Sequence, residues 1–287
     1  MNKLWVAFAV ALVAASDAFA VNIVDDNPLY IPIEGRIYSI SSIGSRTGSE
    51  NIKSWTLNQE FGYGINNRWS VTVATDIIDQ QSFDQWRWDN IAVETKFRAL
   101  DIWSWKADLI AGYIVSNVWA SHRPFLEKNP KIDQNTGFEV AGTGTSYTWA
   151  VGVRGGYTSS QFTIAGHLLL EYFNTGTFNW QEEEGEQGMH VAIFGVDGRI
   201  VLDNHFTLIG GAEYIGFVDN EWYGWPGASV ENSGVWTGKL GLNYNIDTTK
   251  FVGGYMDVSL THDYGENRDE WGFNKGVGFG AKFGIGF

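Results

Sequence analysis

Hydrophobic residues alternate with polar or small residues along most of the chain after residue 33. Side chains of a β-strand point alternately to its two faces, so this period of two predicts strands with one apolar and one polar face. Most of the alternating segments are longer than the roughly five or six residues of an ordinary globular strand. They match the ~9–11 residues with which a tilted strand crosses a bilayer. The twelve predicted strands are residues 34–43, 52–65, 68–79, 88–99, 103–115, 146–158, 161–173, 188–201, 205–217, 234–246, 249–262 and 275–287.

The connections between these segments alternate between short and long. Transmembrane barrels pair short periplasmic turns with long external loops, whereas a soluble sandwich has no reason to sort its connections by length. We therefore predict one all-β domain, a transmembrane antiparallel up-and-down β-barrel of about twelve strands with both termini in the periplasm. The predicted tight turns are residues 66–67, 100–101, 158–160, 202–204 and 247–248, and the main predicted long loops are residues 80–87, 116–145, 174–187, 218–233 and 263–274.

Aromatic residues separate a membrane barrel from a soluble exported sandwich. The chain has 14 Trp, 12 Tyr and 18 Phe with 35 Gly and only 5 Pro, which suits a large sheet with aromatic bands. Eight aromatic residues lie at strand ends beside the tight turns, where a membrane interface would hold their amphipathic rings. The core of a sandwich gives no reason for such a grouping. These residues are Tyr63, Trp69, Phe97, Trp103, Tyr157, Phe162, Phe206 and Tyr244.

The first residues have the pattern of a secretory signal peptide. A basic start at residues 1–3 precedes an apolar run at residues 4–15 and the A-x-A motif that ends at Ala20. The apolar run is too short to cross a bilayer as a helix. We expect a signal peptide at 1–20, a periplasmic N-terminal segment at 21–33 and the barrel at 34–287. The chain contains no Cys, so no disulfide stabilises it after export.

The C-terminal strand carries a more specific resemblance. Phe283, Ile285 and Phe287 share its apolar face and resemble the C-terminal signature by which Gram-negative outer-membrane β-barrel proteins are recognised for assembly. The hairpin at residues 63–70 is similar to the periplasmic hairpins of many such proteins. The resemblance implies an outer-membrane location, contact with outer-membrane lipids and recognition by the barrel assembly machinery. In size the chain is similar to twelve-stranded nucleoside or oligosaccharide channels, but no motif identifies one family.

The polar faces of the predicted strands supply the candidate functional residues. They hold eight acidic and seven basic residues and one His. Four bases, Arg98, Lys106, Arg154 and Arg199, lie toward the tight turns, and three acids, Asp76, Glu171 and Glu213, lie toward the long loops. This set predicts either a charge-lined pore or a network of ion pairs that fills a narrow lumen. Twelve strands lie between filled eight-stranded and open sixteen-stranded barrels, so the size does not decide. The residues are Glu60, Asp76, Glu94, Lys96, Arg98, Lys106, Asp108, Arg154, His167, Glu171, Asp197, Arg199, Glu213, Lys239, Asp257 and Lys282.

The long loops carry most of the net charge of −14. An acidic mouth concentrates cations and repels anions, which predicts a cation preference. Three roles are open for residues 116–145: a constriction inside the lumen, an external binding surface or a mobile external loop. The acidic run 182–184 is interpreted as a solvated loop, because no loop has the spacing of a defined calcium site.

Catalytic motifs are weak. The five histidines lack the His-x-Ser pair of outer-membrane phospholipases, and His262-Asp263 with Asp76 and Asp79 resembles outer-membrane aspartyl-type proteases without their acid spacing. We predict a passive, porin-like channel for small hydrophilic solutes with a preference for cations. We expect no catalytic residue, cofactor, metal or nucleic-acid partner. The alternatives are a closed barrel whose loops bind an external partner through Trp119, Trp180, Trp222, Trp225 and Trp271, and an outer-membrane hydrolase.

Overall fold

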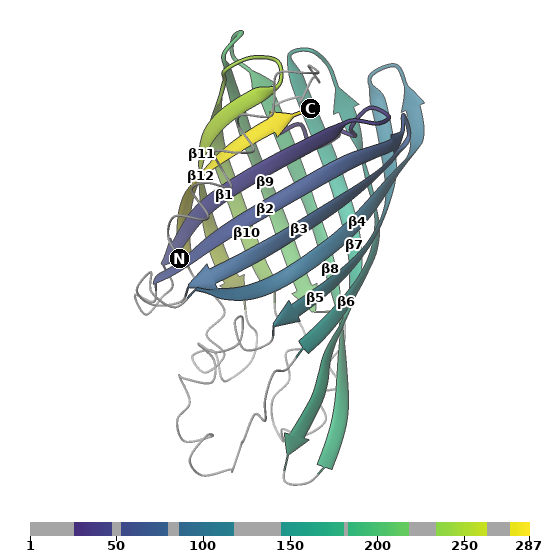
Figure 1. The fold of residues 1–287 in the computed structure, drawn as a ribbon, viewed down its shortest axis with the longest axis vertical. Helices are drawn as coiled ribbons and strands as arrows, with labels where there is room; N and C mark the ends of the chain where they lie inside the picture. The colour runs from purple at the N-terminus through teal and green to yellow at the C-terminus, as the bar shows by residue number, and fades with distance from the viewer. Residues whose placement is uncertain are drawn as a thin grey trace.

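The computed structural model describes residues 26–47, 53–79, 86–117, 145–180, 183–217, 234–262 and 276–287. Each strand of these segments pairs antiparallel with its neighbours in sequence, and β1 also pairs with β12, so that the sheet closes into a barrel (Figure 1). The predicted twelve-stranded antiparallel barrel is confirmed. Among these residues no helix is long and apolar enough to cross a membrane. The strands are β1 (Ile37–Thr47), β2 (Lys53–Asn66), β3 (Trp69–Asp79), β4 (Arg87–Ile102), β5 (Trp105–Asn117), β6 (Thr145–Thr158), β7 (Phe162–Trp180), β8 (Glu183–Val201), β9 (Phe206–Phe217), β10 (Gly234–Asn245), β11 (Lys250–His262) and β12 (Gly276–Gly286).

The pairing register separates the two faces of the sheet. Residues opposite each other on neighbouring antiparallel strands project to the same face, which links the faces around the whole barrel. One face carries exposed hydrophobic side chains such as Leu109, Val151 and Leu168. The other carries Asp108 and Arg154, which are paired in register and largely shielded from solvent. The apolar face is therefore the outside of the barrel and the polar face the inside, the reverse of a soluble sandwich.

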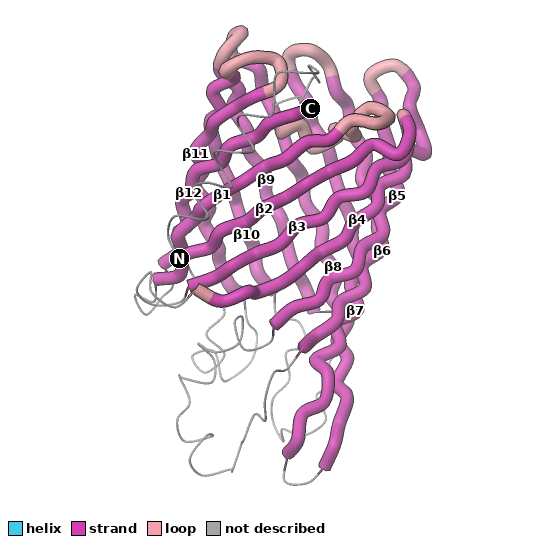
Figure 2. The backbone as a smooth tube through the Cα atoms, in the orientation of Figure 1, coloured by secondary structure: helices cyan, strands magenta, loops and turns pink. Residues whose placement is uncertain are grey.

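The tight connections gather at one end of the barrel, here called the turn end (Figure 2). Side-chain oxygens hold these turns by accepting hydrogen bonds from backbone N–H groups two or three residues on, as Asn, Asp and Ser do in turns. Asn66 Oδ1 accepts from Arg68 N at 2.8 Å, and Ser159 Oγ accepts from Phe162 N at 3.1 Å. Asp203 Oδ1 accepts from the backbone N–H of residues 205 and 206, which lowers the pKa of this exposed carboxyl.

Aromatic rings cover the outside of the barrel near the turn end. They pair across neighbouring strands: the rings of Trp105 and Tyr157 lie 5.5 Å apart, and those of Phe206 and Tyr244 lie 5.3 Å apart. Both pairs have edge-to-face geometry, which aromatic quadrupoles favour. The outer surface thus has the aromatic band that the sequence predicts beside the turns.

Two predicted connections were wrong. The turn expected at residues 100–101 lies at Trp103 and Ser104, because a register shift between Arg98 and Leu100 lengthens β4. Trp103 adopts a positive φ of 55°, which ends the strand at that point. A β-bulge of this kind has no signature in the alternation of hydrophobic residues.

The long loop expected at 174–187 is mostly strand. β7 and β8 are 19 residues each and form a hairpin that extends beyond the neighbouring strands (Figure 1). The segment 177–180 reads Thr-Phe-Asn-Trp, and β-branched and aromatic residues favour strands. The predicted loops at 116–145, 218–233 and 263–274 lie almost entirely outside the described residues, as does the signal peptide, so the roles predicted for them stay predictions.

Glycines on the inward face of β12 leave room for large side chains of β11. Phe251 is 1% exposed and lies opposite Gly284, where a Cβ atom would collide with its ring. The alternating glycines of the last strand thus allow an aromatic ring to fill the lumen wall beside the turn end.

Replacing Gly284 with Val is expected to lower the free energy of unfolding of the barrel by about 1–3 kcal/mol, because overpacking forces the ring of Phe251 to move. Urea unfolding of the protein in detergent, followed by tryptophan fluorescence, measures the change. Gly238→Val is the control, because a Cβ at this outward position meets nothing within 4 Å. Equal effects of the two substitutions would contradict the packing argument.

Candidate functional site

The inward face of the barrel holds the candidate site. The register places on this face all sixteen residues that the sequence analysis assigned to the lumen. The structure does not bring them into one cluster. It divides most of them between a buried ion-pair group on β4 to β6, a water-accessible group on β7 to β10, and smaller contacts elsewhere.

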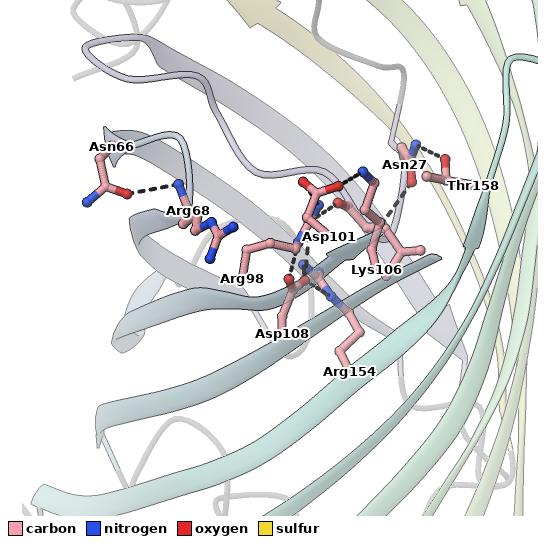
Figure 3. Close-up of polar contacts among 10 residues, drawn as sticks. Asn27, Asn66, Arg68, Arg98, Asp101, Lys106, Asp108, Arg154 and Thr158 are labelled. Carbon is pink, nitrogen blue, oxygen red and sulfur yellow. Dashed lines mark hydrogen bonds and ion pairs between the residues drawn. The ribbon is translucent and has the colours of Figure 1, made fainter. Parts of the chain in front are cut away.

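The buried group centres on Asp108 of β5, between Arg98 of β4 and Arg154 of β6 (Figure 3). Arg98 Nε donates to Asp108 Oδ1, and Arg154 donates to Asp108 Oδ2 from Nη2 at 2.5 Å and from Nε at 3.1 Å. The Asp108 side chain is 0% exposed. Asp101 extends the group, since it pairs with both Arg98 and Lys106.

Burial decides what this group does. A carboxylate removed from water loses several kcal/mol of solvation, which only close, well-oriented cations restore. Asp108 meets this condition, because two guanidinium groups donate to its two oxygens. The group therefore fixes three adjacent strands to one another and leaves this part of the wall dry.

The second group lies midway along β7 to β10. His167 contacts Asp197 through Nδ1 at 3.3 Å and Glu213 through Nε2 at 3.2 Å, and Lys239 Nζ lies 2.7 Å from Asp197 Oδ1. The side chains of Lys239 and Glu213 are 54% and 40% exposed although both face inward. Water therefore reaches the middle of the lumen along this wall.

Other predicted residues make local contacts. Glu60 accepts a hydrogen bond from the hydroxyl of Tyr38 at 2.6 Å, and Lys96 pairs with Glu94 at 2.6 Å. Asp76 accepts hydrogen bonds from the side-chain amides of residues 58 and 90 at 2.7 and 2.9 Å, which link it to both neighbouring strands. The remaining members, Glu171, Arg199 and Asp257, also face inward.

The sequence analysis did not predict that the segment from Asp26 to Glu34, just before β1, contacts the inward face. Asp26 pairs with Lys282 of β12, and Asn27 Nδ2 donates to Thr158 Oγ1 of β6 at 3.2 Å. The backbone carbonyl of Leu29 accepts from Arg98 Nη2 at 2.5 Å, and Leu29 is 3% exposed. The segment therefore joins strands on different sides of the barrel.

The middle of this segment packs against aromatic rings of the wall. The rings of Tyr30 and Tyr38 lie 5.9 Å apart in edge-to-face geometry, and Tyr38 forms a buried cluster with Phe251. Burial raises the pKa of Tyr30 to about 12. The one local sign in the sequence is Asn27-Pro28, a dipeptide that favours turns, and Asn27 Oδ1 does accept from the backbone N–H of Leu29 at 2.9 Å.

Inward residues near the turn end are buried around most of the circumference. They include polar residues that are normally exposed, such as Ser70 at 1% and Thr207 at 0%. The wall and the N-terminal segment together thus exclude solvent at this end, in contrast to the middle of the lumen. The buried inward residues of the turn end include Tyr38, Ser70, Thr72, Arg98, Asp108, Thr163, Ala165, Arg199, Thr207, Ile209, Asn243 and Phe251.

No protein-family model and no curated protein sequence matches this chain. Among solved structures the chain is similar to the NanC porin, with a TM-score of 0.54, 10% identity and coverage of 86% of this chain and 98% of that one. It is also similar to an outer membrane channel from Pseudomonas putida F1, with a TM-score of 0.56, 9% identity and coverage of 93% and 100%. A third similar structure is the translocator domain of autotransporter NalP from Neisseria meningitidis, with a TM-score of 0.50, 11% identity and coverage of 100% of this chain and 95% of that one. The chain has the fold of an outer-membrane β-barrel.

This fold agrees with the membrane location inferred from the sequence, and the apolar outer surface gives its physical basis. Channels and a translocator domain share the fold, so the function of this chain has to be argued from its own lumen. Within the described residues, no group of three or more His, Asp or Glu side chains is placed to hold a metal ion. What the inward face offers chemically is a set of fixed charges in contact with water on one wall.

Proposed function

We propose that the protein is a passive channel of the Gram-negative outer membrane for small hydrophilic solutes. One observation carries the proposal: the side chain of Lys239 faces inward at mid-barrel and is 54% exposed. A lumen filled by its own side chains would bury a residue at that position. The sixteen inward residues predicted from the sequence are then its lining, and they offer polar partners and fixed charges to a hydrated solute.

A preference for cations is the finer part of the proposal. The net charge of −14 lies mainly in the loops, and Glu171 and Glu213 face the lumen on the side toward the loop end. The bases Arg98 and Arg154 lie nearer the turn end, where Asp108 neutralises part of their charge. A cation entering from the loop end thus meets a favourable potential first.

Single-channel recording in planar bilayers under a salt gradient tests this proposal. Openings with a reversal potential that favours cations are expected, and Glu213→Gln should lower the cation-to-anion permeability ratio by about twofold, because one of the exposed lumen carboxylates loses its charge. Asp247→Asn, an exposed acid of a tight turn, is the matched control. Silence from folded barrel, both intact and lacking residues 26–33, would contradict the channel.

The competing function is a closed barrel whose loops bind an external partner. The dry turn end favours it, but the water-accessible wall at Lys239 does not. Folding into the outer membrane by the barrel assembly machinery, through Phe283, Ile285 and Phe287, applies to both and is part of the proposal. No catalytic step is part of the proposal.

A further inference from the structure

The turn end of the lumen is closed in part by the chain's own N-terminal segment. We propose that residues 26–34 form a displaceable plug that controls access to the lumen from the turn end. This inference deepens the proposed channel function and rests on it, but the plug itself is testable without measuring transport.

The attachment of the segment supports displacement. Residues 26–33 belong to no strand, and their described polar ties to the wall are the Asp26–Lys282 ion pair, the Asn27–Thr158 hydrogen bond and the Leu29–Arg98 hydrogen bond. Tyr30 adds its ring contact with Tyr38, and Glu34 adds an isolated bridge to Gly64 and a 3.5 Å hydrogen bond from its backbone N–H to Asn67 Oδ1. These are isolated contacts, in contrast to the continuous backbone ladders that hold each strand. Breaking them leaves the barrel wall closed.

The junction with β1 contains Gly35, whose backbone N–H donates to Gly64 O at 2.8 Å. Gly35 has a positive φ of 74°, and a Cβ there would meet nothing within 4 Å. Glycine tolerates both positive and negative φ, so once the hydrogen bond to Gly64 breaks, the chain can change direction at Gly35 with little backbone strain. Just before it, the carbonyls of Pro32 and Ile33 lie against Gly64 so closely that a Cβ atom on Gly64 would collide with both. The absence of a side chain at Gly64 is what lets the segment lie against the wall.

The closed position leaves one polar group of the segment without a partner. Tyr30 Oη is buried and has no hydrogen-bond partner among the described residues. A buried polar group without a partner is unfavourable, and moving the segment outward would return Tyr30 to water. The closed and open positions therefore differ less in free energy than the apolar burial of Leu29 and Tyr30 alone would imply.

Labelling of a single cysteine tests the plug, because the chain contains no natural Cys. Ser70 is 1% exposed, faces inward and pairs in register with Gly64, the residue against which Pro32 and Ile33 of the plug lie. Ser70→Cys is reconstituted into vesicles or kept in detergent, and its reaction with a charged, membrane-impermeant maleimide is followed by mass spectrometry. We expect slow labelling in the full chain and labelling at least about tenfold faster when residues 26–33 are deleted.

A point variant tests displacement in the full-length chain. It also keeps the plug testable in case the deletion variant does not fold. Asp26→Asn removes the ion pair with Lys282, while Asn tolerates the positive φ of 61° at this position. Labelling of Ser70→Cys is expected to become about five- to tenfold faster, since the open position gains population when a contact of the closed one is lost. Asp203→Asn removes one exposed acid at the same end without touching the segment and should change nothing.

Each outcome decides the matter. Equal labelling with and without residues 26–33 shows that the wall alone seals Ser70 and overturns the plug. Faster labelling after the deletion but not with Asp26→Asn shows a fixed plug and overturns displacement. Faster labelling in both, with no current from any variant, keeps the plug and overturns only the channel.

Discussion

Asp108→Asn is expected to lower the free energy of unfolding of the barrel by about 3–5 kcal/mol, because it removes the buried carboxylate charge to which two largely buried guanidinium groups donate. Asp108 is 0% exposed and lies between Arg98 and Arg154. The substitution keeps the size of the side chain, so packing changes little and the charge is what is lost. Urea unfolding and refolding in detergent, followed by tryptophan fluorescence, measures the difference.

Two controls isolate the buried charge. Asp101→Asn removes an acid that also pairs with Arg98 but is 39% exposed, and it should cost less than about 1 kcal/mol. Arg154→Met should be less harmful in the Asp108→Asn protein than in the natural one, because the two residues interact directly. Additive effects, or similar costs for the two acids, would show that the wall does not depend on this ion-pair group.

Phe287→Ser is expected to lower the amount of folded barrel in the outer membrane of cells at least tenfold, while refolding of the purified chain from urea into detergent changes little. The reason is that, in the proposed assembly role, the side chain is what the assembly machinery recognises, whereas closure of the barrel uses the backbone. Phe287 N donates to Ile37 O at 2.8 Å, and Ile37 N donates to Phe287 O at 3.3 Å. Ser keeps both hydrogen bonds.

Phe279→Ser is the matched control for this prediction. Phe279 lies on the same outward face of β12, is 58% exposed and is not part of the three-residue signature. Heat-modifiable gel mobility of outer-membrane fractions gives the folded amount in cells. If Phe287→Ser lowers refolding in detergent as strongly as assembly in cells, the residue acts in stability and the proposed recognition by the assembly machinery fails.

The alternation of side chains determined the number of strands, their order and the division of residues between the two faces. This information is local, because a period of two in a strand is set by its own backbone and by what each face contacts. Lipid outside and water inside made the pattern clear, so residues as distant as Glu60 and Lys282 are placed on one face without any knowledge of their neighbours. The alternation could not show the bulge between Arg98 and Leu100 that moved the turn to Trp103. A bulge adds one residue to a strand, and no particular residue type marks the added position.

Which inward charges meet, and which part of the lumen is dry, was decided only by the tertiary structure. The stagger between strands brings Arg154 to Asp108 across 46 residues, and nothing in either strand alone specifies that register. The N-terminal segment contacts Arg98 and Thr158, which lie 69 and 131 positions further along the chain than their partners Leu29 and Asn27. Closure of the barrel brings those strands around the segment. Local pattern fixes the face on which a side chain lies, whereas long-range pairing fixes its neighbours, and it is the neighbours that distinguish an open lumen from a closed one.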